Sequence, residues 1–221
     1  MIPFEPVDGP RIEYLRVRNY GVLGDVVLEN LTPLTVLIGP NGSGKSTVFD
    51  VFSFLAECLT DGLRKAVKRR GGIRELRSRG GEGPISIEVL YRRSPKEPRL
   101  RYFLEIEEGG TFPYILREFM KIKLKYGNEE DIFSYDDETV EVNTKYVEIM
   151  GVPLLPNTKF LEAPDSYTLA LDVVKTVSND KNLNALSEFL TSWHLSGLDI
   201  AAMRAVPEAG PETALSVTGG N

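Results

Sequence analysis

The 221-residue sequence contains no glutamine, one cysteine and one histidine. A lone Cys58 cannot form a disulfide within the chain, which excludes the class of small secreted domains held together by disulfides. No run of 18 apolar residues occurs, so the sequence offers no membrane-spanning helix. The opening stretch MIPFEPVDGP lacks the basic and then apolar pattern of a signal peptide. Together these absences predict a cytoplasmic protein with no membrane association.

The composition is that of an ordinary globular protein, with 42% hydrophobic and 26% charged residues. A collagen-like fibre and a disordered tail are therefore excluded. The net charge of -6 disfavours the chain as a whole as a nucleic-acid binder. The charge is unevenly placed, however. Residues 1–110 carry 17 basic and 15 acidic side chains, whereas residues 111–221 carry 9 and 17.

One segment is strongly basic. Positions 64–79, RKAVKRRGGIRELRSR, hold eight Lys and Arg residues and a single acid, Glu75. Such a segment predicts a surface for the phosphates of DNA or RNA, with Arg69, Arg70 and Arg74 as candidate contacts. The alternative is a solvated helix end followed by a loop, because cations are favoured near a helix C-terminus.

The first half of the chain predicts strands and then a helix. Residues 11–18 alternate apolar and polar side chains, as a half-buried strand does, and a short strand is expected over 26–28. The run LTVLI at 34–38 is continuously apolar and predicts a strand buried on both faces of a sheet. From Lys45 the apolar spacing becomes helical until Gly62 interrupts it.

From about residue 84 the pattern changes to period two. The segments ISIEVLY, LRYFLEIEE, YILREFMKIKLKY, DIFSY and TVEV predict an antiparallel meander of four to six strands. Residues 151–166 resemble a loop, and SYTLALDVVKTV and NLNALSEFLTSWHL are helical in pattern. We therefore expect a nucleotide-binding core over 1–83, a meander over 84–150, and a helical segment with a tail over 151–221.

The motif that carries chemistry is GPNGSGKST at 39–47. It matches the phosphate-binding pattern G-x-x-x-x-G-K-[ST], between a predicted strand and a predicted helix. The candidate nucleotide contacts are Gly39, Pro40, Asn41, Gly42, Ser43, Gly44, Lys45, Ser46 and Thr47.

Each part of this motif has a physical role. Gly42 and Gly44 let the backbone approach a phosphate, and the helix that follows points its positive dipole end toward it. Lys45 supplies a compact positive charge to the β- and γ-phosphates, and the Ser46 hydroxyl is the candidate Mg²⁺ ligand. The alternative is a glycine-rich turn that binds nothing.

This loop resembles that of ABC-type ATPase heads, especially the SMC/RecF-like group, which includes RecF-like AAA ATPases and relatives of OLD nucleases. The opening strand, Arg-Asn-aromatic segment and second strand are similar to the start of those heads, as is the meander. The stretch SWHLSGLDIAAMRAVP…LSVTGGN is similar to a segment of the RecF-like ATPases. The resemblance implies an α/β fold, namely the N-terminal lobe of a P-loop NTPase with a β-meander subdomain and C-terminal helices. It also implies that Arg18 reaches the nucleotide.

The chain departs from that family where hydrolysis is concerned. No apolar run ends in Asp-Glu, and LALD at 169–172 is followed by Val173. LSGLD at 195–199 lacks the second glycine of the family signature, and Thr218-Gly219-Gly220 lies at the end of the chain. The family also uses a glutamine and a histidine near its nucleotide, and this sequence contains no glutamine. Its single histidine, His194, is interpreted as a residue on the face of a helix. No catalytic residue is identifiable, and we expect that the chain is cut before the C-terminal lobe.

Three functions remain open from the sequence. The first is the ATP- and Mg²⁺-binding part of an ATPase that acts in DNA repair, maintenance or phage defence, and that needs a C-terminal lobe and a dimer of heads. The second is a nucleotide-binding regulatory or partner-binding module without hydrolysis. The third, a P-loop kinase, is disfavoured by the meander and by the absence of an arginine-bearing lid helix. ATP is preferred to GTP because the resemblance implies it and no Asn-Lys-x-Asp motif is present.

Overall fold

The structure is a computed structural model, and it describes residues 9–110, 112–124, 127–136, 138–147, 159–178 and 180–193. Eight strands form a single antiparallel sheet in the order β2-β1-β3-β4-β5-β6-β7-β8. The strands are β1 (Arg11–Tyr20), β2 (Leu23–Glu29), β3 (Ile85–Arg92), β4 (Arg99–Gly109), β5 (Phe112–Lys123), β6 (Glu129–Asp136), β7 (Thr139–Val142) and β8 (Lys159–Glu162). The helices are α1 (Lys45–Asp61), α2 (Leu63–Arg69), α3 (Ile73–Leu76), α4 (Ala170–Val177) and α5 (Lys181–Thr191).

The predicted meander is confirmed as strands β3 to β7. In β4 buried and half-buried side chains alternate along the strand, as the period-two pattern predicts. The hairpin β1–β2 joins the same sheet, because β1 pairs with β3 in antiparallel register. The sheet thus runs without a break across residue 84, and the expected division into three domains stays a prediction.

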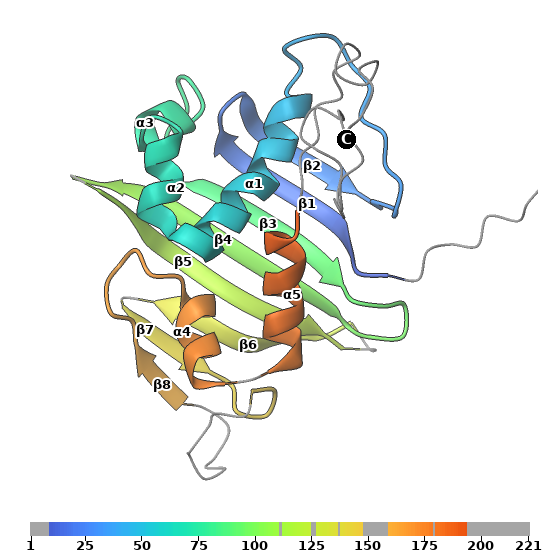
Figure 1. Ribbon diagram of the computed structural model, residues 1–221, viewed down its shortest axis with the longest axis vertical. Coiled ribbons are helices and arrows are strands. Elements are labelled where there is room, and N and C mark those ends of the chain that lie inside the picture. The colour runs from blue at the N-terminus through green and yellow to red at the C-terminus, as the bar shows by residue number, and fades with distance from the viewer. Residues whose placement is uncertain are drawn as a thin grey trace, which may run out of the picture.

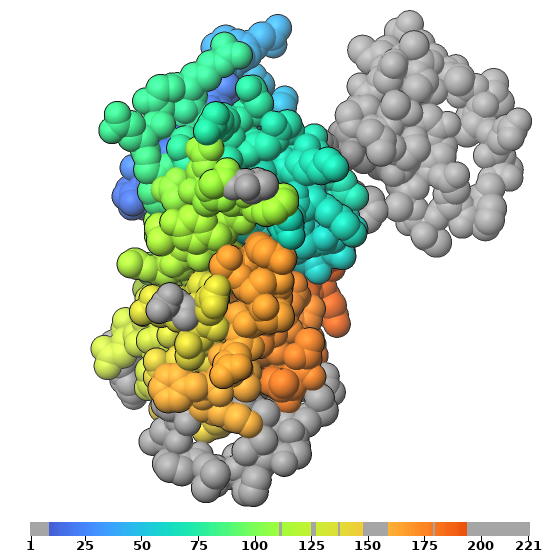
Figure 2. Space-filling model, turned by 90° about the vertical axis from the view of Figure 1, so that its left-hand side faces the viewer, coloured from blue at the N-terminus to red at the C-terminus, as the bar shows by residue number. Residues whose placement is uncertain are grey.

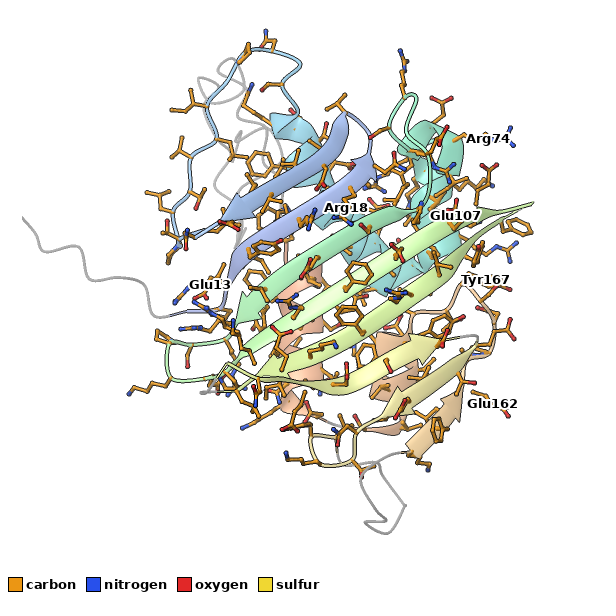
Figure 3. All side chains as sticks on the ribbon, turned by 180° about the vertical axis from the view of Figure 1, so that it is seen from behind. Glu13, Arg18, Arg74, Glu107, Glu162 and Tyr167 are labelled. Carbon is orange, nitrogen blue, oxygen red and sulfur yellow. The ribbon has the colours of Figure 1, made fainter. Side chains whose placement is uncertain are left out.

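The helices α1, α2, α4 and α5 cover one face of this sheet (Figure 1). On α1 the buried side chains recur at helical spacing and form the apolar stripe that packs into the core: Val48, Val51, Phe52, Phe54, Leu55 and Cys58. The opposite face carries no helix among the described residues (Figure 3) and presents cross-strand ion pairs, such as Arg101 with Glu88. No helix in this part of the chain is long and apolar enough to cross a membrane.

The prediction of a buried strand over 34–38 is wrong. The segment has no regular secondary structure, and Leu34, Val36 and Ile38 are 71%, 70% and 92% exposed. A strand buried on both faces needs hydrogen-bonded neighbours, and none of the eight described strands pairs with this segment. Leu37 alone packs partly against the core. The apolar composition of this segment indicates a preference for burial, but it does not identify a strand with which the segment can pair.

One smaller difference lies in the last third of the chain. Strand β8 falls in the stretch that was expected to be a loop, where Phe160 and Glu162 are exposed and give little apolar signal. The LALD tetrapeptide lies at the start of α4, in the helix that the pattern of SYTLALDVVKTV predicts. Both predicted helices of this region are confirmed as α4 and α5.

Candidate nucleotide-binding site

The loop over residues 39–47 leads directly into α1, which begins at Lys45. Gly42 and Gly44 have φ angles of 80° and 93°, in the left-handed region that glycine adopts without strain. Gly44 is the residue that caps the helix N-terminus, and its carbonyl accepts the first helical hydrogen bond, from Val48 N at 2.9 Å. The free N–H groups and the dipole of a 17-residue helix therefore face the loop, as an anion site requires.

The turn between β1 and β2 supports the second half of this loop. A Cβ on Gly44 would lie 2.8 Å from Leu23 Cδ2, and a Cβ on Gly21 would lie 2.9 Å from Thr47 Cγ2. Both positions therefore need glycine for close packing as well as for backbone conformation, since Gly21 also has a positive φ of 56°. The sequence pattern alone does not indicate this contact between the turn and the loop.

The Lys45 side chain folds back over the loop. Its Nζ donates hydrogen bonds to the carbonyl oxygens of Gly39 at 2.7 Å and Pro40 at 2.6 Å, and to Ser43 Oγ at 3.3 Å. The ammonium group is thus held against the backbone of the phosphate-binding loop. The Ser46 side chain is exposed in the first turn of α1.

These residues fit a nucleotide phosphate with Mg²⁺. An exposed hydroxyl beside phosphate oxygens is a donor set that Mg²⁺ takes, with the remaining positions filled by water. Lys45 and the α1 N-terminus would hold the phosphates, and Ser46 would hold the ion. Gly42 has no atom within 4 Å of its Cβ position, so its surroundings are open to a ligand.

A partly buried polar network joins the end of β1, α1 and the end of α2. Tyr20 Oη donates to Asp50 Oδ2 at 2.6 Å, and Arg70 Nη2 donates to Asp50 Oδ1 at 2.9 Å. Arg70 also pairs with Glu57, which lies about two helical turns after Asp50 on α1. Burial, and then the hydrogen bond to Asp50, raise the pKa of Tyr20. The hydroxyl therefore stays protonated and donates to Asp50 throughout the physiological pH range.

Arg18, the remaining predicted nucleotide contact, is not brought to the loop. It lies on β1 on the helix-free face (Figure 3) and pairs with Asp25 of β2 at 3.3 Å. Its neighbour Asn19 has a φ of 62°, which breaks the strand alternation and turns Asn19 and Tyr20 both into the interior. The Asn19 amide donates to the carbonyls of Glu82 and Gly83.

The three predicted nucleic-acid contacts are paired with carboxylates. Arg69 contacts Asp61 at 2.5 Å, Arg70 contacts Asp50 and Glu57, and Arg74 contacts Glu108 at 2.7 Å. The alternative reading of this segment, a helix end followed by a loop, describes its local structure: α2 ends at Arg69 with Lys68 and Arg69 in its last turn.

Other predicted positions lie outside the described residues, namely His194, the LSGLD segment and Thr218-Gly219-Gly220. Asp172 is the acid of the LALD segment. Burial raises its pKa to about 6 in α4.

Comparison with known proteins gives one match. Residues 34–179 match the model of a family described as "AAA domain, putative AbiEii toxin, Type IV TA system". The match begins at the segment that precedes the phosphate-binding loop and includes α1, α2 and the whole meander. No curated protein and no solved structure matches. Because the matched residues make up more than half of the sequence, the chain belongs to this AAA family of P-loop ATPases.

Proposed function

We propose that this chain is the ATP-binding part of an ATPase of the SMC/RecF-like kind, which binds ATP with Mg²⁺ through residues 39–47 and acts on DNA in repair, maintenance or defence. The observation that carries the proposal is the loop that enters α1, with left-handed Gly42 and Gly44 followed by Lys45 at the first helical position. The family description, which names a toxin of a toxin–antitoxin system, favours a defence role.

Hydrolysis, in this proposal, needs a second lobe and the pairing of two heads. The apolar row formed by the alternate residues Leu34, Val36 and Ile38 supports this view, because all three side chains are exposed and alternate residues share one face once a segment forms a strand. Such a row is suited to burial against a neighbouring strand that the described residues do not contain. A lobe that supplies this strand could also supply the Asp-Glu pair for Mg²⁺ and for activation of water.

The experiment is a nucleotide titration. Fluorescence anisotropy of a labelled ATP analogue, with Mg²⁺ present, should show saturable binding by the full chain. Lys45→Ala removes the charge on the phosphates and should weaken binding at least about tenfold, which corresponds to about 1.4 kcal/mol. Lys181→Ala, which removes an exposed lysine at the start of α5, is the matched control and should leave affinity unchanged. Equal affinity of the Lys45→Ala variant and the unmodified chain would refute the proposed site.

Turnover separates the proposal from a non-hydrolysing module. We expect binding with little phosphate release by the chain alone, and release upon addition of a C-terminal lobe that carries an Asp-Glu pair. A binding chain that never turns over with that lobe would be a regulatory module. Turnover by the chain alone, abolished by Lys45→Ala, would show that no further lobe is needed.

A further inference from the structure

The basic segment over 64–79 is divided by the structure into paired and unpaired cations. Arg69, Arg70, Arg74 and Arg77 make ion pairs with acids of α1 or β4. Arg64, Lys65 and Lys68 make no ion pair with any described residue. These three lie at spacings of one and three along α2, on the side that faces the β4–β5 turn. Arg79, the remaining cation of the segment, also makes no ion pair with a described residue but lies elsewhere, so three of the four unpaired cations lie together at one place.

That place is a hollow of about 510 Å³ between α2 and the turn that joins β4 to β5. Its lining includes the three cations, together with Glu108, Gly110 and Phe112. Figure 2 shows turquoise atoms of the α1–α2 region beside green atoms of β4 and β5 on one side of the molecule. Glu108, the one acid of the lining, is engaged by Arg74 at 2.7 Å and faces Arg77 at 3.9 Å. The charge of this carboxylate is thus neutralised by two arginines that do not line the hollow, so the lining keeps a surplus of positive charge.

An aromatic surface borders the same cations. The Arg64 guanidinium carbon lies 3.4 Å from the centre of the Phe112 ring and 4.5 Å from that of Tyr167. This stacking fixes Arg64 at the edge of the hollow while its N–H groups remain able to donate. Phe112 is 49% exposed, although a ring of this size is usually buried. Tyr167, Arg74 and Glu107 mark this edge of the molecule in Figure 3.

We propose that this hollow binds single-stranded DNA, with backbone phosphates on Arg64, Lys65 and Lys68 and an unstacked base on Phe112. The inference rests on the part of the proposed function in which the ATPase acts on DNA. It moves the contact away from Arg69, Arg70 and Arg74, whose charges are already compensated. Cations beside an exposed ring are the pairing that single strands require, since the backbone needs charge and each base offers a ring face. A duplex keeps its bases stacked and would use the cations alone.

The test is fluorescence anisotropy of a labelled 20-nucleotide single strand and of the matching duplex, with the full chain and with Mg²⁺ and an ATP analogue. Lys65→Glu with Lys68→Glu should weaken single-strand binding at least tenfold and reduce the salt dependence of the affinity. Phe112→Ala should weaken single-strand binding about fivefold or more and leave duplex binding unchanged. The matched control is Lys96→Glu with Lys181→Glu, which makes the same charge change at exposed lysines elsewhere. It should change affinity less than twofold.

Each result decides the question. No binding of the single strand, equal losses in the paired lysine variants and their control, or an unaffected Phe112→Ala variant would overturn the proposal. Thermal unfolding of each variant verifies that it is folded. Binding of the ATP analogue is measured in the same samples: its loss with intact DNA binding would refute the nucleotide site alone, and the reverse would refute this surface alone.

Discussion

Tyr20, the last residue of β1, donates a hydrogen bond of 2.6 Å to Asp50 in the second turn of α1. Asp50 also accepts a hydrogen bond from Arg70, which follows α2. The guanidinium carbon of Arg70 lies 5.2 Å from the centre of the Phe54 ring. Because Tyr20 precedes the Gly21 turn that packs on the phosphate-binding loop, one carboxylate joins the strand end, the loop helix and the next helix.

Arg70 should matter more to stability than its neighbour in the same basic segment. Its side chain is 13% exposed and serves two carboxylates, whereas that of Arg74 is 83% exposed. Arg70→Met leaves Asp50 without its cation and removes one of the two arginines that pair with Glu57, so we expect a loss of about 2 kcal/mol in the free energy of unfolding. Arg74→Met should cost less than about 0.5 kcal/mol. Urea denaturation measures both, and similar costs for the two variants would contradict the network.

Gly44 should be the least replaceable glycine of the loop. An alanine there must adopt a φ of 93° and place its Cβ 2.8 Å from Leu23, so we expect a loss of about 2–4 kcal/mol together with weaker nucleotide binding. Gly24→Ala on β2 is the control, because nothing lies within 4 Å of its Cβ position and its φ is not positive. If thermal unfolding finds the two variants equally stable, the loop does not pack on the hairpin as described.

The sequence predicted the elements whose pattern is local. The alternation of the meander and the helical spacing after Lys45 each indicate which side of the element is buried, and both predictions are confirmed. The error at 34–38 has a different origin, since apolar side chains record a preference for burial but not the strand that satisfies it. The pairing of Arg70 with Asp50 was likewise invisible, because it joins residues 20 positions apart through the packing of two helices. The left-handed Asn19 that redirects Tyr20 has no marker beyond the turn residues around it.

Exposure of the 34–38 segment can be tested with two valines. Val36 is 70% exposed and Val89 of β3 is fully buried. Val89→Thr buries a hydroxyl in an apolar setting and should cost about 1–3 kcal/mol. Val36→Thr should alter stability by less than about 0.5 kcal/mol in this chain. A cost at Val36 equal to that at Val89, measured by urea denaturation, would place the segment inside a sheet after all.

The single tryptophan reports on the loop helix. Trp193 packs on Phe52 of α1 with ring centres 4.5 Å apart, and Phe52 is itself buried. Phe52→Ala should cost about 3–5 kcal/mol and shift tryptophan emission to the red as water reaches the indole. Phe160→Ala removes an equal ring that is 65% exposed on β8 and should do neither. Unchanged emission in the Phe52→Ala variant would separate Trp193 from α1.

Stability should fall as the pH rises from about 5 to 8, because of one buried carboxyl. Glu118 of β5 is fully buried and accepts hydrogen bonds from the backbone N–H groups of Ala170 and Leu171 and from Tyr102 Oη. Burial raises the pKa of Glu118 from 4.5 to about 7, against the opposite effect of these hydrogen bonds. The folded state therefore holds this proton more tightly than the unfolded state does. The resulting stabilisation is complete below about pH 4.5 and is lost as the pH passes 7.

The size of this decline follows from the shift and is about 3 kcal/mol for Glu118, with a further contribution of the same sign from Asp172. Glu118→Gln cannot ionise, so its free energy of unfolding should vary less between pH 5 and 8, and Asp172→Asn should reduce the slope further. Glu141→Gln, at an exposed position on β7, should keep the slope of the unmodified chain. Urea denaturation at each pH gives the comparison. Stability that rises with pH over this range would mean that hydrogen bonding outweighs burial, and that the carboxylate caps α4 in its charged form.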